Sequence, residues 1–257
     1  MLARRLAYAL GAVRQAVRRG EVPHHLRRLP IVGKLRRLNA GRRMLPVSAN
    51  YGASRGKPID RYYIDSFLRR FAAHEGYAEG CIRGRILEIG GRTYADRFGH
   101  PDARIDVLHV NGENPIATIV GDLTDPGALT PDTYDCVICT QTLPVIWDPP
   151  AALRTMHRGL APGGVLLITV PGITRALLPD RDNWGDWWRF TSSSMRRLCE
   201  DVFGPGTVEV ESYGNLVSAT LFLHGHAAQE LYSRELDVRD PNYEVIIGVR
   251  ARKPGTG

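Results

Sequence analysis

Short runs of apolar residues alternate with amphipathic stretches along most of the chain. Asp148 and Pro149 predict the start of one helix, which continues through residues 151–160 until an APGG turn ends it. Runs rich in Val, Ile and Leu predict five strands, at residues 85–89, 104–110, 117–120, 134–139 and 165–170. Buried strands that alternate with helices are typical of a parallel sheet with both faces covered. The pattern therefore predicts a doubly wound α/β fold.

The two ends of this pattern differ from its middle. Pro58 begins a stretch whose apolar positions repeat with helical spacing, which predicts a helix ahead of the first strand. Near the other end, residues 207–213 and 242–250 predict two further strands, and the segment between them starts a helix near Asn215. Two late strands joined by one helix can close the sheet as an antiparallel pair. We therefore expect a Rossmann-like, seven-stranded, mostly parallel sheet with an antiparallel last strand.

Positive charge is concentrated at the N-terminus. Residues 1–57 contain 14 lysines and arginines and the single acidic residue Glu21, whereas residues 58–257 contain 20 basic and 26 acidic residues. The first twenty residues place leucine and valine at helical spacing, with the arginines mostly on the other side, which predicts a basic amphipathic helix. We therefore expect a basic helix and linker at 1–57, an α/β domain at 58–252 and a flexible tail at 253–257.

A basic amphipathic helix of this kind can bind an anionic membrane surface. A partner protein, nucleic acid and a solvated arm are the alternatives; nucleic acid is disfavoured because the body is mildly acidic and offers no basic track. No apolar run approaches the roughly 18 residues of a membrane-spanning helix. The four cysteines are too few for a disulfide scaffold, and those of YDCVIC lie on a predicted strand, where we expect core thiols. These features predict a cytoplasmic protein, peripheral at the inner face of the membrane through residues 1–20.

Candidate chemistry lies just after the strands, because a doubly wound sheet binds ligands beyond the carboxyl ends of its strands. The first strand ends in EIGG, where Glu88 is followed by Gly90 and Gly91. The GxGxxG spacing of NAD-dependent dehydrogenases is absent, and a carboxylate at this place would repel a pyrophosphate. It suits a ligand with an ammonium group or hydroxyls, so the chemistry points away from a dinucleotide.

Five segments in order resemble the motifs of class I S-adenosylmethionine-dependent methyltransferases, in particular the group called methyltransferase type 11. They are EIGG, RIDVLHVN, VGDL, TQTL and LAPGG. Arg92 and Thr93 stand where family members usually have a further glycine. The resemblance implies S-adenosylmethionine as the cofactor and the following residues around it: Glu88, Gly90 and Gly91 at the methionine part, Asn111 at the ribose, Asp122 and Leu123 at the adenine, and Gln141 on the opposite side.

The segment 182–198 combines three tryptophans with Asp186 and Arg189. Aromatic faces beside polar groups suit stacking on sugar rings, so Trp187 and Arg189 are predicted substrate contacts; a tryptophan-rich plug of the core edge is the alternative. A hydroxyl acceptor would benefit from a general base, and Asp186 and His224 are the candidates, with a purely structural histidine as the alternative for His224. Nothing in the sequence requires a metal ion.

Tyr62 and Tyr63 stand in PIDRYY, just before the α/β domain. Members of the family often fold an N-terminal helix over the cofactor, and by that resemblance either tyrosine could cover the sulfonium, since a cation beside an aromatic ring is favourable. A helix packed on the sheet edge is the alternative. The order of motifs also resembles bacterial methyltransferases encoded beside glycosyltransferases, which implies a carbohydrate or glycolipid acceptor.

Taken together, the residues and the resemblance predict a methyltransferase that acts on a sugar hydroxyl of a glycan, glycolipid or glycosylated natural product. One alternative is an RNA methyltransferase whose basic arm binds phosphates, which a steep salt dependence of RNA binding would support. The other is a non-catalytic relative whose cofactor site has eroded at Arg92, Thr93 and Asn111. Affinity for the cofactor separates this relative from the enzyme.

Overall fold

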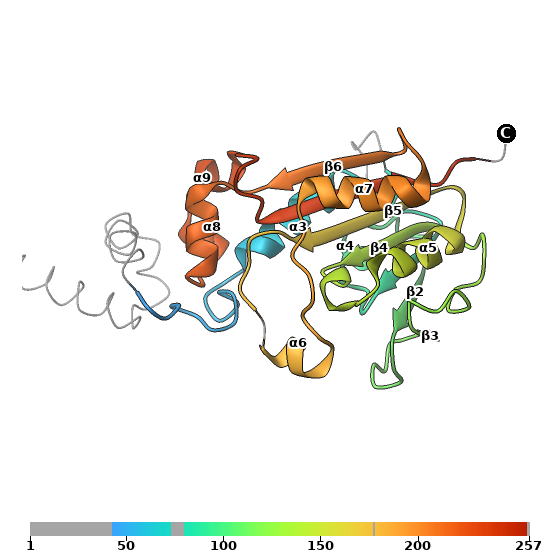
Figure 1. The fold of residues 1–257 in the computed structure, drawn as a ribbon, viewed down its shortest axis with the longest axis horizontal. Helices are drawn as coiled ribbons and strands as arrows, with labels where there is room; N and C mark the ends of the chain where they lie inside the picture. The colour runs from blue at the N-terminus through green and yellow to red at the C-terminus, as the bar shows by residue number, and fades with distance from the viewer. Residues whose placement is uncertain (1–42, 73–79, 177, 256–257) are drawn as a thin grey trace, which may run out of the picture. The chain divides into compact units, whose positions relative to one another are not determined.

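A computed structural model describes residues 43–72, 80–176 and 178–255 (Figure 1). The described residues form two compact units. The first unit comprises residues 43–62 and 214–243, and the second comprises 63–213 and 244–255. Helix α3 (Ile59–Arg69) gives its first four residues to the first unit and the rest to the second. The predicted amphipathic helix at residues 1–20 lies outside the described residues.

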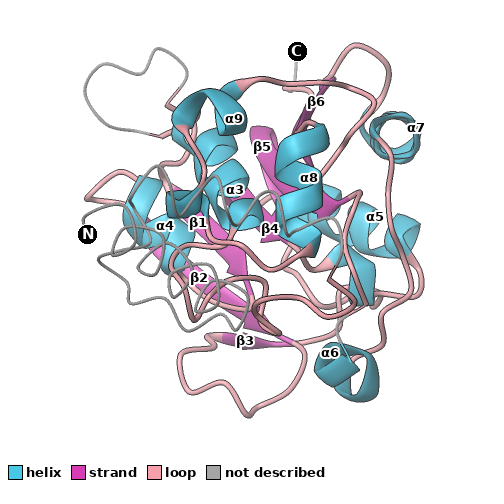
Figure 2. Ribbon diagram, turned by 90° about the vertical axis from the view of Figure 1, so that its left-hand side faces the viewer, coloured by secondary structure: helices cyan, strands magenta, loops and turns pink. Residues whose placement is uncertain are grey.

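The second unit is built on a seven-stranded sheet, drawn in magenta in Figure 2, with the order β3-β2-β1-β4-β5-β7-β6. Strand β7 is antiparallel to both of its neighbours, and the other neighbouring strands are parallel. The strands are β1 (Arg85–Ile89), β2 (Arg104–His109), β3 (Ile119–Val120), β4 (Tyr134–Thr140), β5 (Leu160–Pro171), β6 (Val208–Tyr213) and β7 (Ile246–Arg252). This confirms the predicted Rossmann-like sheet with an antiparallel last strand.

Two helices of the second unit begin at side-chain caps, and the cap of the first of them, Asp148, was predicted. Helix α5 (Pro149–Gly159) follows Asp148, whose side chain accepts a hydrogen bond from the Ala151 N–H at 2.9 Å. Helix α7 (Ser192–Phe203) follows Thr191, which forms a capping box with Ser194. The hydrophobic pattern did not predict the short elements α4 (Thr93–Phe98), η2 (Leu143–Val145) and α6 (Leu178–Asn183).

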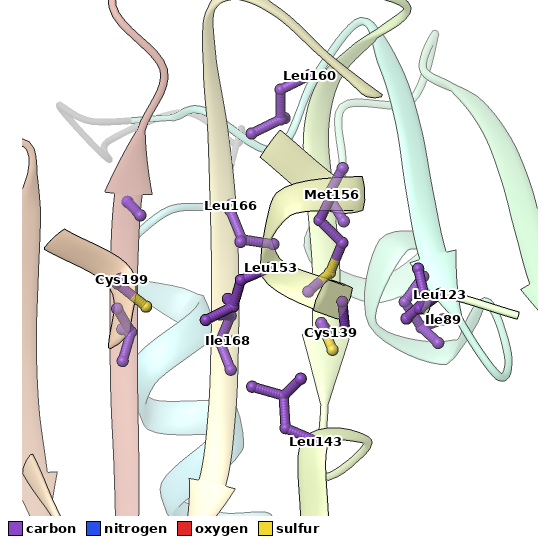
Figure 3. Packing of buried hydrophobic residues seen from close by; sticks show 14 of the residues in the cluster. Ile89, Leu123, Cys139, Leu143, Leu153, Met156, Leu160, Leu166, Ile168 and Cys199 are labelled. Atoms are coloured by element: carbon purple, nitrogen blue, oxygen red, sulfur yellow. The ribbon is translucent and has the colours of Figure 1, made fainter. Parts of the chain in front are cut away.

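The core of the second unit packs side chains of α5 and α7 against the sheet (Figure 3). Leu153 and Met156 of α5 are fully buried in it, and so is Cys199 of α7. Burial raises the pKa of the Cys139 and Cys199 thiols to about 12, so these side chains stay protonated. Cys136 and Cys139 of YDCVIC are both buried on β4, where they act as core residues, as predicted.

His157 of α5 gives the core a pH dependence that can be measured. Its ring meets the Phe203 ring edge-on at 4.7 Å between centroids, and burial lowers its pKa below the ordinary 6.5. As the pH falls through 6.5 the unfolded chain therefore binds more protons at this residue than the folded protein, and stability is lost down to the folded pKa. Urea denaturation at pH 7.5, 6.5 and 5.5 should show a smaller loss of unfolding free energy for His157→Gln than for the wild type. Equal losses would contradict this assignment.

The first unit contains α8 (Leu216–Leu223), η3 (Ala228–Glu230) and α9 (Ser233–Asp237). The sequence pattern predicts a longer helix from Asn215, but α8 ends at Leu223 because Gly225 adopts a φ of 77° and turns the chain. Residues 43–57, expected to be part of an extended linker, instead form hydrogen-bonded turns within this unit. Among these bonds, the Val47 N–H donates to the His224 carbonyl at 2.7 Å.

A buried ion pair with a histidine also holds the first unit together. The Arg55 guanidinium donates to both carboxylate oxygens of Glu230, at 2.6 and 3.2 Å, and His226 Nδ1 lies 2.8 Å from the same carboxylate. The three side chains are only 5 or 6% exposed. A charge network this deeply buried requires all of its partners, because a missing partner leaves a charge in a low-dielectric environment.

Candidate active site

A cavity of about 500 Å³ lies in the second unit at the carboxyl ends of β1, β2, β3 and β4. Doubly wound sheets bind their ligands at this edge. The segments that follow these strands line the cavity, together with two stretches that contain tryptophan. Among the lining residues are Gly90 after β1, His109 and Val110 at the end of β2, Asp122 and Leu123 after β3, Gln141 after β4, and Trp147, Trp184 and Trp187.

The loop after β1 leaves open space in the cavity. Gly90 has a φ of 82°, and a β-carbon built on Gly90 or Gly91 would meet no atom within 4 Å. The Gly90 N–H donates to the Leu108 carbonyl at 2.9 Å, and Asn114 Nδ2 donates to the Gly90 carbonyl at 3.0 Å. A fixed backbone without a side chain lets a ligand approach the peptide groups directly. The loop is therefore suited to hold a ligand close to the sheet.

Glu88 contacts the backbone that follows this loop, at the start of α4, and does not line the cavity. Its carboxylate accepts hydrogen bonds from the N–H groups of Tyr94 and Ala95, at 3.1 and 2.7 Å, at the start of α4. Burial raises the pKa of Glu88, and these two backbone N–H groups oppose that rise. The structure thus corrects the predicted cofactor contact of Glu88 to a positioning role, because the carboxylate joins β1 to α4 across the glycine turn.

At the end of β2, the cavity is lined by His109 and Val110 in place of the predicted Asn111. The Asn111 amide donates to Glu113 at 3.0 Å and lies outside the lining. His109 Nδ1 lies 3.1 Å from the Asn111 carbonyl oxygen. The Asn111 N–H also donates to Nδ1, at 3.4 Å, so both contacts of this nitrogen are to the Asn111 backbone. Nε2 is the ring nitrogen left for a ligand, as donor or acceptor according to the tautomer. His109 therefore replaces Asn111 as the candidate ribose contact.

The turn after β3 presents a carboxylate beside an apolar side chain. Asp122 Oδ1 accepts from the Thr124 N–H at 2.8 Å and from the Thr124 hydroxyl at 2.9 Å. Within the part of the chain that the structure describes, these are the only hydrogen bonds of this carboxylate, so Oδ2 is available to a ligand. Leu123 is 3% exposed. Such a site suits a flat heteroaromatic ring that carries an amino group.

Gln141, at the end of β4, holds a strained backbone conformation in the cavity. Its φ is 55°, a left-handed value that costs a residue other than glycine about 1–3 kcal/mol. The Gln141 N–H donates to the Thr169 carbonyl at 2.8 Å, which fixes this conformation against β5. Strain of this kind is concentrated at binding sites, where the surrounding structure maintains it. The predicted place of Gln141 beside the cofactor agrees with this geometry.

Three exposed tryptophans border the same cavity. Trp147, Trp184 and Trp187 are 68, 42 and 52% exposed. The Trp147 and Trp187 rings meet edge-on at 5.2 Å between centroids. The backbone N–H of Trp187 donates to the Pro144 carbonyl at 2.8 Å, which joins the two segments. Only Trp188 fits the alternative of a core plug, since its Nε1 donates to the Ile146 carbonyl at 3.0 Å and its ring packs against the core.

Asp186 and Arg189 lie on either side of Trp187 in the sequence and bind each other. Both guanidinium Nη atoms donate to the carboxylate, at 2.7 and 2.8 Å, and Arg189 also donates to the carbonyls of Trp188 and Arg175. Neither side chain lines the cavity. The bidentate geometry fixes the loop that carries Trp187. The structure therefore corrects the predicted base Asp186 and the predicted substrate contact Arg189 to positioning residues.

Of the other predicted residues, Tyr63 belongs to the core of the second unit. It is 1% exposed and its ring lies 5.9 Å from that of Tyr213, which corrects the predicted contact with a sulfonium. In the first unit, the Tyr62 hydroxyl lies 2.6 Å from the Asp237 carboxylate, and His224 follows the last residue of α8. Burial lowers the pKa of His224, and its role as a base stays a prediction.

Residues 59–201 match the family model of a methyltransferase domain. A segment of 96 residues is 31% identical to Probable polyketide synthase 8/35 of Dictyostelium discoideum; it covers 36% of this chain and only 4% of that protein.

Two solved structures are similar in fold. One is a SAM-dependent methyltransferase from Archaeoglobus fulgidus, with 16% identity, 75% of this chain and 94% of that chain covered, and a TM-score of 0.47. The other is phosphoethanolamine N-methyltransferase 2 of Haemonchus contortus in complex with S-adenosyl-L-methionine, with 15% identity, 82% and 54% covered, and a TM-score of 0.47.

The cavity residues fit S-adenosylmethionine. The Asp122 carboxylate can accept from the adenine amino group, His109 Nε2 can form a hydrogen bond with a ribose hydroxyl, and the loop at Gly90 leaves room for the methionine part. The family match extends over all of these residues and over more than half of the chain. The chain therefore belongs to the methyltransferase domain family.

Proposed function

We propose that the protein transfers the methyl group of S-adenosylmethionine to a sugar hydroxyl on a glycan, glycolipid or glycosylated natural product. The observation that carries the proposal is the group of exposed tryptophans, Trp147, Trp184 and Trp187, on the border of the cofactor cavity. Indole rings offer large apolar faces together with a polar N–H edge. This combination suits a sugar ring, which has apolar C–H faces and hydroxyls at its rim.

S-adenosylmethionine supplies a methyl group on a positively charged sulfur atom. In the proposed reaction the acceptor oxygen uses a lone pair to form the new O–CH₃ bond while the C–S bond breaks, and sulfur keeps the bonding pair. The hydroxyl proton passes to water. The protein has to align the acceptor oxygen, the methyl carbon and the sulfur, and to exclude competing water.

The tryptophans and Gln141 provide this alignment in the proposed reaction. We call the three tryptophans Trp147, Trp184 and Trp187 the acceptor wall. The backbone hydrogen bond between Trp187 and Pro144 joins this wall to η2, which directly follows Thr142 in the chain. The ion pair of Asp186 with Arg189 fixes the other side of Trp187. The ring of a sugar stacked on Trp187 would therefore be held at a defined distance from the strained backbone at Gln141.

The proposal is tested by measuring S-adenosylhomocysteine formation with a panel of methyl glycosides, with catechol and ethanolamine as non-sugar acceptors. We expect turnover of a glycoside by the wild type. The kcat/KM should fall by up to about tenfold in Trp187→Ala and recover in Trp187→Phe, since aromatic stacking contributes about 0.5–1.5 kcal/mol beyond the buried area. The affinity for S-adenosylmethionine should stay unchanged in both variants. Turnover of ethanolamine or catechol alone, or a Trp187→Ala variant as active as the wild type, would contradict a sugar acceptor.

A further inference from the structure

The first unit exposes a row of apolar side chains along α8. Ala219, Leu221 and Phe222 are buried in the unit, whereas Leu216 and Leu223 are 56 and 41% exposed on the other side of the helix. Val217, beside Leu216, is also 41% exposed. A helix that is apolar on all sides requires a second apolar contact beyond the one that its own unit provides.

The one polar side chain in this row does not change its character. Thr220 stands four residues after Leu216 and three before Leu223, so the three positions share one side of α8. The Thr220 hydroxyl donates to the Leu216 carbonyl at 2.8 Å. Its hydrogen-bonding capacity as a donor is therefore satisfied within the helix, and its methyl group remains for contact with an apolar environment.

Two further apolar side chains extend this row at the C-terminal end of α8. Met44 is 98% exposed and Leu45 is 76% exposed. They come just before Val47, whose N–H donates to the carbonyl of His224, the residue that follows Leu223. The hydrogen bond brings this segment to the end of α8. Together the five residues Met44, Leu45, Leu216, Val217 and Leu223 make up the α8 face.

The chain that leads into the α8 face is strongly basic. Residues 1–43 contain 12 lysines and arginines and only one acidic residue, Glu21. Apolar side chains that continue directly from a basic segment are typical of proteins that bind at the interface of an anionic bilayer. Within the described part of the chain, no helix has both the length and the apolarity to cross a bilayer. The basic segment and the apolar row that continues from it favour binding at the surface of a membrane.

Charge argues against a second copy of the chain as the occupant. Two copies joined through their α8 faces would bring two segments of this composition together, and like charges repel. An anionic lipid surface satisfies both features at once, since headgroups attract the basic segment and acyl chains accept the apolar row. We propose that the α8 face binds the surface of a membrane that contains anionic lipids. The proposal is independent of which acceptor the enzyme methylates.

Vesicle co-sedimentation of the full chain tests the proposal. The probes are vesicles of phosphatidylcholine alone and of phosphatidylcholine mixed with phosphatidylglycerol. The variant is Leu216→Ser combined with Leu223→Ser, and the matched control is Ile116→Ser, which changes a 47% exposed side chain of the second unit. We expect the wild type and the control to bind mixed vesicles. The affinity of the double variant should be lower by about tenfold or more, because two apolar anchors are lost.

Equal binding by the wild type and the double variant would overturn the proposal, because the basic segment alone would then account for it. Absence of binding by the wild type would overturn it too. Light scattering that shows a dimer in the wild type and a monomer in the double variant, without vesicle binding, would assign the α8 face to a second copy. Should the double variant fail to fold, Leu223→Trp replaces it: its added fluorescence should shift to the blue on mixed vesicles and be quenched by brominated acyl chains, and no change would overturn the proposal.

Discussion

Replacing Gly90 by valine should weaken the binding of S-adenosylmethionine about 10–100-fold while the protein stays folded. A β-carbon at Gly90 enters space in which no protein atom lies within 4 Å, and this space belongs to the cavity. The new side chain would therefore compete with the cofactor and not with the core. Forcing extra methyl groups into a filled site costs about 1–3 kcal/mol or more, and every 1.4 kcal/mol changes affinity tenfold.

The left-handed backbone of Gly90 requires a control that carries the same strain. Gly206, in the turn between α7 and β6, has a φ of 79°, and a β-carbon there also meets nothing within 4 Å, but Gly206 does not line the cavity. Gly90→Val and Gly206→Val should lose similar stability in thermal denaturation, and only Gly90→Val should lose cofactor affinity in calorimetric titration. Similar affinity in both variants would place the cofactor elsewhere.

Replacing Glu230 by alanine should lower the free energy of unfolding of the first unit by about 3–5 kcal/mol. The Glu230 carboxylate binds the Arg55 guanidinium through both oxygens and also contacts His226 Nδ1, and all three side chains are buried. Removing the carboxylate leaves the Arg55 charge without its acceptor in the interior. Hydrogen exchange should show the loss of protection at the N–H groups of Val47 and Gly225, which bond within this unit.

The matched control for this variant is Glu209→Ala. Glu209 also pairs with an arginine, Arg250, at 2.6 Å, but its side chain is 54% exposed. A pair that water can reach contributes about 0–1 kcal/mol, so urea denaturation should detect little change. A loss in Glu230→Ala as small as that in Glu209→Ala would mean that the buried network does not stabilise the first unit.

Local features of the sequence were sufficient to predict most of the sheet and its helix caps. The run RILEI predicts β1 at the residues where it is observed, because β-branched and long apolar side chains favour a buried strand. Asp148 was identified as a cap because its side chain bonds to the next turn of the same chain. Such contacts involve near neighbours, which a single sequence shows directly.

The candidate site was less predictable because it depends on contacts between distant segments. The resemblance of the segments after the strands to methyltransferase motifs identified Gly90, Asp122 and Gln141, which do line the cavity. It did not show that Glu88 turns toward α4, which requires knowledge of that short helix. Only the register of β2 on β1, which pairs Leu108 with Ile89, places His109 beside Gly90.

The acceptor wall shows the same limit. Trp187 was identified from its own segment, whereas Trp147 was not singled out, because TQTLPVIW has no local pattern that marks its tryptophan as functional. The two rings meet because the backbone N–H of Trp187 donates to the carbonyl of Pro144, more than forty residues earlier in the sequence. That the tryptophans of the two segments lie together can be inferred only once the carboxyl ends of β4 and β5 are known to be neighbours.

Calorimetric titration of the wild type and of Asp122→Ala with S-adenosylmethionine tests the central claim most directly. The claim is that the cavity at the carboxyl ends of β1 to β4 binds the cofactor, with Asp122 on its adenine amino group. We expect one site of micromolar affinity in the wild type, and an affinity about 10–100-fold lower in Asp122→Ala, since a hydrogen bond to a charged group contributes about 1.5–3 kcal/mol. Asp125→Ala, in the same turn but outside the cavity lining, should bind as the wild type does. No binding at millimolar cofactor, or equal affinity in the wild type and Asp122→Ala, would contradict the claim.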